Sequence, residues 1–134
     1  MMFHFPSTSK RVELNTDKDI NNEIKRETFE NISHFIGKDD EEILSRIEEL
    51  DEEWDIERLL EANAASIVAL STILGFTRNK RWFAISGMVG CLLLHHALYG
   101  WCPPVPMLRR LGIRTSSEIN YEKEALKNLL EFPY

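Results

Sequence analysis

Cysteine, glycine and proline are scarce in this chain of 134 residues, and each scarcity excludes a class of protein. Two cysteines, Cys91 and Cys102, are too few for a disulfide framework, so we expect free thiols in a reducing compartment. With 6 glycines, 5 prolines and 43% hydrophobic residues, neither a low-complexity chain nor a disordered one is expected. The N-terminus lacks the charged start and long apolar run of a signal peptide, so secretion is not expected.

The chain also lacks the side-chain patterns of common enzymes. It contains no recognisable glycine-rich phosphate loop, Ser/His/Asp set or pair of catalytic carboxylates. It has no basic stripe of the kind that binds nucleic acid. We therefore expect a protein that is not an enzyme, uses no cofactor and binds no nucleic acid.

Charge is unevenly distributed along the sequence. Residues 1–61 hold 18 of the 22 acidic residues and 8 of the 16 basic ones, whereas residues 62–134 hold 4 acidic and 8 basic residues. The net charge of −6 therefore combines an acidic half with a basic half. An acidic, helix-periodic half followed by an apolar one predicts a solvated module attached to a less soluble one.

Two uncharged apolar segments follow one another in the second half. Residues 82–101 contain no Asp, Glu, Lys or Arg, and as a helix they would span roughly 30 Å, the thickness of a bilayer core. Residues 62–76 would span roughly 22 Å, and a polar turn over 77–81 joins the two. Because a helix that is apolar all round must be covered on every side, a membrane-embedded hairpin is favoured. The alternative is a soluble helical oligomer with the hairpin as its interface.

Small side chains recur in both segments at the spacing of helical neighbours. Such residues let membrane helices approach closely, so we expect them in the packing of the hairpin. They are Ala62, Ala65, Ser66, Ala69, Ser86, Gly87 and Gly90.

Basic residues near the ends of the apolar segments indicate an orientation. Three lie in the turn over 77–81, and five lie at the opposite ends: Arg46, Arg58, Arg109, Arg110 and Arg114. Since cytoplasmic loops are enriched in Lys and Arg, both termini are expected in the cytoplasm.

The predicted fold is all-α. We expect an acidic helical region over 1–57, the apolar hairpin over 58–101, and a Pro-rich exit turn with a final helix over 102–134. Residues 1–15 are expected to be irregular or extended, and Pro103, Pro104 and Pro106 to force an extended exit from the hairpin.

Helix signals place the remaining elements. A helix is predicted over 18–36, and a capping box of Thr115 and Glu118 predicts another over 116–130. A helix that starts near residue 39 meets no Pro or Gly before the first apolar segment, so we expect the two to be continuous. Its apolar positions, which we expect to pack on the helix over 18–36, are Ile43, Ile47, Leu50 and Trp54. The alternative is a short coiled-coil zipper between copies of the chain.

The block from 100 to 115 carries a Gly-Trp-Cys-Pro motif and then Leu-Gly-Ile-Arg-Thr. With Gly-Met-Val-Gly at 87–90, it resembles the YgaP-like inner-membrane hairpin family over about residues 54–128. The resemblance implies a protein of the bacterial inner membrane with two short transmembrane helices. The stretch 96–104, His-Ala-Leu-Tyr-Gly-Trp-Cys-Pro-Pro, is similar to that of longer members with charged N-terminal helices. The namesake of the family carries a rhodanese domain that this sequence lacks, so the resemblance implies no activity.

Cys102 is the candidate reactive thiol. It lies at the expected membrane boundary, and cations at Arg109 and Arg110 would lower its pKa and favour a persulfide carrier. The alternative is a rigid exit turn in which the cysteine only packs.

A metal site is a weaker hypothesis. Thiolates and imidazoles suit zinc or copper, and four such side chains lie close in sequence. They are Cys91, His95, His96 and Cys102. Their spacing fits no standard zinc pattern, and the alternative is that they pack within the bundle.

Arg109, Arg110 and Arg114 follow the second apolar segment, where basic residues commonly bind anionic lipid headgroups. Taken together, the patterns predict a small inner-membrane scaffold or accessory subunit. Its partners are expected to be membrane lipid and either further copies of itself or a larger membrane complex.

Overall fold

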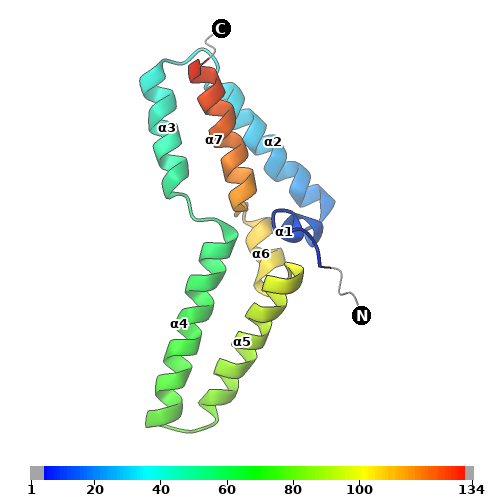
Figure 1. Ribbon diagram of the computed structural model, residues 1–134, viewed down its shortest axis with the longest axis vertical. Coiled ribbons are helices and arrows are strands. Elements are labelled where there is room, and N and C mark those ends of the chain that lie inside the picture. The colour runs from blue at the N-terminus through cyan, green and yellow to red at the C-terminus, as the bar shows by residue number, and fades with distance from the viewer. Residues whose placement is uncertain (1–4, 132–134) are drawn as a thin grey trace.

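Every regular element is a helix in the computed structural model, which describes residues 5–131. The helices are α1 (Arg11–Leu14), α2 (Lys18–His34), α3 (Asp40–Glu52), α4 (Ile56–Thr77), α5 (Trp82–Tyr99), α6 (Pro104–Arg110) and α7 (Ser116–Glu131). Figure 1 shows α4 and α5 side by side at one end of the molecule, and α2, α3 and α7 at the other. We call α4 and α5 the hairpin, and the other helices the head. The all-α prediction with an apolar helical hairpin is confirmed.

The hairpin is joined by the polar turn between Thr77 and Trp82 and closed by small and hydroxyl-bearing residues. The Ser86 hydroxyl lies 2.5 Å from that of Ser71 and 3.1 Å from that of Thr72. At Gly75 an added Cβ would lie 2.7 Å from the Phe83 ring, so the absence of a side chain lets α5 approach. These contacts suit helices that pair in an apolar environment, where small residues and hydrogen bonds replace the hydrophobic effect.

The predicted packing residues are only partly in this contact. Ser86 lies in it and Ala62 is partly buried, but the remaining five are exposed: Ala65, Ser66, Ala69, Gly87 and Gly90. Nothing lies within 4 Å of a Cβ built on Gly87 or Gly90. For these five exposed residues, a role in helix packing stays a prediction. Spacing identifies residues that share a helix face, but it does not say which face turns to the neighbouring helix.

The head is organised around α7, which contacts both α2 and α3. Its core consists of Ile43, Ile47, Leu50, Ile119 and Leu126. The apolar side of α3 therefore packs on α7 and not along α2, which corrects our expectation. The helix start at Thr115 is confirmed: Glu118 N–H donates to Thr115 Oγ1 at 3.3 Å, and Thr115 N–H to the Glu118 carboxylate at 2.9 Å.

A break separates α3 from α4, so the expected continuous helix is wrong. Asp55 has an extended backbone, and its carboxylate accepts a hydrogen bond from Arg58 N–H at 3.1 Å, which starts α4 afresh. Ile56 N–H donates to the Arg114 carbonyl at 2.9 Å. The chain needs no Pro or Gly to stop α3, because an N-cap and a distant segment satisfy the freed backbone groups.

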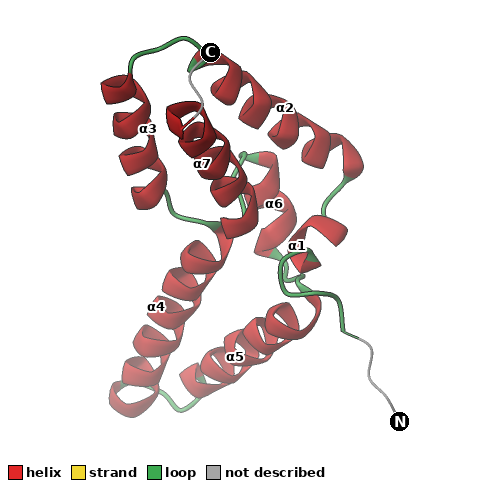
Figure 2. Ribbon diagram, turned by 45° about the horizontal axis from the view of Figure 1, so that its top comes forward, coloured by secondary structure: helices red, strands yellow, loops and turns green. Residues whose placement is uncertain are grey.

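Two short helices stand where extended chain was expected. Helix α1 forms within the segment predicted to be extended, and Figure 2 shows it near the end of α5. Pro104 and Pro106 lie in the first turn of α6. Proline is tolerated there because the first N–H groups of a helix have no partner within it, so the prolines begin α6 and do not prevent it.

Candidate functional site at the junction of hairpin and head

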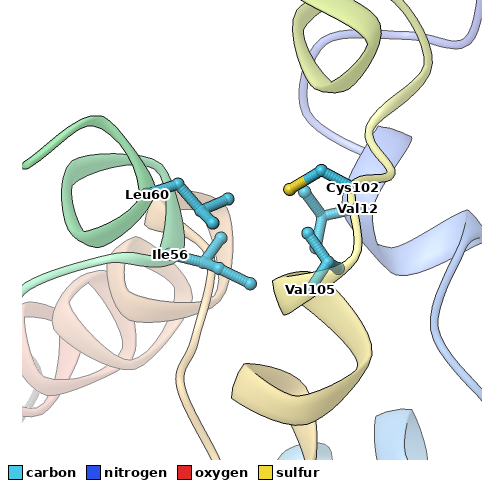
Figure 3. Packing of buried hydrophobic residues seen from close by; sticks show 5 residues of the cluster. All are labelled: Val12, Ile56, Leu60, Cys102 and Val105. Atoms are coloured by element: carbon cyan, nitrogen blue, oxygen red, sulfur yellow. The ribbon is translucent and has the colours of Figure 1, made fainter. Parts of the chain in front are cut away.

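An apolar cluster holds the hairpin to the head. It comprises Val12 of α1, Ile56 and Leu60 of α4, Cys102, and Val105 of α6, all buried. Figure 3 shows Ile56 and Leu60 on one side, facing Val12, Cys102 and Val105 on the other. Three helices distant in sequence therefore share one small core at the base of the hairpin.

Cys102 belongs to this cluster and is only 5% exposed. Burial raises the pKa of its thiol, and the negative charge of Glu57 adds to that effect, whereas a hydrogen bond from the Val105 backbone opposes it. The guanidinium of Arg109, which was expected to lower this pKa, instead donates to Thr16, Asn21 and Glu118. A reactive thiol needs to be exposed and to have a lowered pKa. Cys102 meets neither condition, so the structure gives no support to a persulfide carrier.

The four weak metal candidates do not converge. Cys91 is exposed on α5, His95 Nδ1 lies 2.8 Å from the Trp101 carbonyl, and His96 Nε2 lies 2.7 Å from Glu57. Within residues 5–131, no group of three or more His, Cys, Asp or Glu side chains could hold a metal ion. The four side chains therefore form no metal site among the described residues of one chain. Gly100 ends α5 in the left-handed conformation, with a φ of 83°, so Cys102 does not lie on the helix that carries the other three candidates.

Arg109 is fully buried and joins three parts of the head. Its guanidinium donates to Asn21 at 2.9 Å, to Thr16 at 3.2 Å and to the two Glu118 carboxylate oxygens at 2.5 and 3.0 Å. Burial alone would raise the pKa of Glu118, but the hydrogen bonds from Arg109 and Thr115 hold it below its ordinary value.

Arg114 is the second buried cation, 7% exposed. It donates to Glu53 at 3.0 and 2.5 Å and pairs with the fully buried Glu122, which Arg46 also contacts at 3.0 Å. Burial would lower the pKa of Arg114, but the two carboxylates raise it. This network fixes the break between α3 and α4 against α7.

The lipid-headgroup prediction is therefore wrong for Arg109 and Arg114, because both are buried and paired with carboxylates inside the head. Arg110 is exposed, and for it the prediction stands untested. Glu53, Glu118 and Glu122 were not predicted as partners of these arginines. Glu118 and Glu122 lie in the same basic half as Arg109 and Arg114, so the charge asymmetry of the two halves could have indicated only Glu53.

Helix α1 closes the end of α5. Arg11 donates to the Ala97 carbonyl at 3.3 Å and Asn15 to the Tyr99 carbonyl at 2.7 Å, which satisfies groups left free at the helix end. A Cβ on Gly100 would lie 2.5 Å from the Arg11 backbone. Arg11 also pairs with Glu57 of α4 at 3.0 Å.

The outward faces of the hairpin are apolar. Phe76 is 80% exposed, Leu70 62% and Leu94 60%. Two helical stretches, one ending at Thr77 and the other Trp82–Tyr99, are long and apolar enough to cross a membrane.

Comparisons with known proteins also indicate a membrane hairpin. The family described as "Inner membrane protein YgaP-like, transmembrane domain" matches residues 55–118. No curated protein and no solved structure matches the chain. The matched stretch contains the whole hairpin, α6 and the junction cluster apart from Val12. Over residues 55–118 the chain is therefore similar to the YgaP-like transmembrane domain family of inner-membrane proteins.

Proposed function

We propose that this chain is a non-enzymatic scaffold or accessory subunit of a bacterial inner-membrane assembly. In this proposal it is one of the longer family members with charged N-terminal helices. The hairpin anchors the chain, and the head presents an acidic surface to a partner. The observation that carries the proposal is the apolar outward face of the hairpin, left uncovered by a head whose buried charges are paired within it.

The lengths of the two helices support the anchor. Helix α4 has 22 residues and α5 has 18, which correspond to roughly 33 and 27 Å, close to the thickness of a bilayer core. The apolar run over 62–76 alone is too short to cross the bilayer core. The restart of the helix at Asp55 gives α4 the additional turns.

The surface of α3 supports the docking role. Its exposed side carries a row of carboxylate side chains that suits a partner with a basic surface. They are Asp40, Glu41, Glu42, Glu48, Glu49, Asp51 and Glu52. The exposed small residues on the outer sides of α4 and α5 suit association of the hairpin with further copies or with other membrane helices.

Fractionation tests the anchor. The expressed protein is expected to stay in membranes washed with carbonate and to dissolve only in detergent, because the outward faces of its hairpin are apolar and exposed. In mild detergent, light scattering is expected to give a protein mass above that of one chain. A soluble, discrete oligomer in the cytosol would contradict the proposal and make the hairpin a subunit interface.

Orientation is a separate prediction: both termini are cytoplasmic, and the turn between α4 and α5 lies outside. A chain with Cys91→Ser and Cys102→Ala would carry one new cysteine, either Asn79→Cys in the turn or Ser45→Cys on α3. A membrane-impermeant maleimide is expected to label the turn in intact spheroplasts, and α3 only after permeabilisation. Labelling in the reverse order would place the head outside.

A further inference from the structure

His96 is the most deeply buried histidine of the described chain, 2% exposed, in the last turn of α5. Its Nε2 lies 2.7 Å from Glu57 Oε2, while Nδ1 is buried and has no hydrogen-bond partner. The other oxygen of Glu57 accepts from Arg11 at 3.0 Å. One carboxylate thus joins the end of α5 to α1.

The charged and titratable surroundings of His96 are few. Helix α4 contributes Glu57, α1 contributes Arg11, and the segment after α5 contributes the Cys102 thiol, which interacts with Glu57. On α5 itself, His95 is directed to the Trp101 carbonyl. From α6 and α7, Arg109 and Glu118 pair with one another. An open cavity of about 360 Å³, lined by Arg11, Glu57 and Ser116 among others, gives water access to the carboxylate.

Neutral His96 is fully accommodated by this geometry except at Nδ1. As the Nε2–H tautomer, its single donor is bonded to Glu57, and Glu57 is neutralised by Arg11. A proton added at Nδ1 would create a second donor with no acceptor in a buried place. It would also place two cations on one carboxylate, so His96 and Arg11 would compete for Glu57.

We propose that His96, Glu57 and Arg11 form a proton-operated latch. Neutral His96 leaves Glu57 to Arg11, which holds α1 across the end of α5. When Nδ1 gains a proton, the His96 cation takes over Glu57, and Arg11 leaves with its four-residue helix. Val12 then leaves the apolar cluster and uncovers Cys102. The latch goes beyond the scaffold role and does not depend on it, because it concerns a contact within one chain.

Cys102 reports on the latch, since it is buried against Val12. The full chain with Cys91→Ser, in detergent micelles, would be treated with 4,4′-dithiodipyridine, and each rate divided by that of free cysteine at the same pH. Lowering the pH from about 8 to about 5, where histidine changes charge, is expected to raise the relative rate about tenfold. His96→Gln, which keeps a donor to Glu57 but gains no proton, is expected to abolish the rise. His95→Gln is the matched control and is expected to retain it.

A second variant keeps the test decisive if His96→Gln fails to fold. Arg11→Gln removes the ion pair that holds α1, so Cys102 is expected to react fast at both pH values. The latch is overturned by a relative rate independent of pH in the starting chain. It is also overturned by an equal rise in folded His96→Gln, or by full protection of Cys102 at pH of about 8 in Arg11→Gln.

Discussion

Arg109→Ala is expected to destabilise the head by about 3 kcal/mol, because it leaves the partly buried Glu118 without its counter-charge. Glu118 would keep its place behind α6 with only the Thr115 N–H for its carboxylate, and Asn21 and Thr16 would each lose a hydrogen bond. The measurement is urea unfolding in detergent micelles, followed by circular dichroism. The neighbouring Arg110→Ala is the matched control: Arg110 is exposed, and a change within about 0.5 kcal/mol is expected.

Acid is expected to act on the same pair. The pKa of Glu118 is lowered in the folded protein, so its contribution to stability is present above the pKa of the unfolded chain and is lost as pH falls through the folded pKa. Arg109→Ala should remove most of this acid dependence. Equal unfolding midpoints for Arg109→Ala and Arg110→Ala would show that the buried pair does not hold the head together.

Gly100→Ala is expected to detach α1 from the hairpin. The φ of Gly100 is +83°, which costs a residue with a Cβ about 1–2 kcal/mol. The added Cβ would also lie 2.5 Å from the carbonyl carbon and oxygen of Arg11. Backbone atoms cannot rotate away as a side chain can, and overpacking of this kind costs about 1–3 kcal/mol more.

Two readouts test this prediction. The urea midpoint is expected to fall, and Cys102 is expected to become reactive at neutral pH as Val12 moves away. Gly87→Ala is the control, because nothing lies within 4 Å of its added Cβ and the residue is helical. Alanine there is expected to be neutral or to stabilise by up to about 1 kcal/mol. Protection of Cys102 in Gly100→Ala equal to that in Gly87→Ala would contradict the tight contact of α1 with α5.

Features that depend on near neighbours were predictable from the sequence. The capping box of Thr115 and Glu118, the start of α2 and the polar turn of the hairpin each involve residues a few positions apart, so local patterns contain the information. The same holds for the uncharged run over 82–101, whose composition alone indicates an apolar surrounding. The family resemblance extended these local signals to the whole hairpin.

Features that depend on distant residues were not predictable. The break before α4 depends on the hydrogen bond from Ile56 to the Arg114 carbonyl. The burial of Arg109 depends on its hydrogen bond to Asn21, 88 positions away. No local pattern distinguishes an arginine that meets lipid from one that meets a buried glutamate, because both follow an apolar segment.

The sequence by itself determined the helical class, the apolar hairpin and the resemblance to a membrane family, because periodicity and composition act within one segment. Only the tertiary structure decided that α3 packs on α7, that α1 closes α5, and that Cys102 is buried at their junction. Those outcomes depend on which complementary surfaces meet when the chain closes on itself, and elements far apart in sequence supply the two sides of each contact.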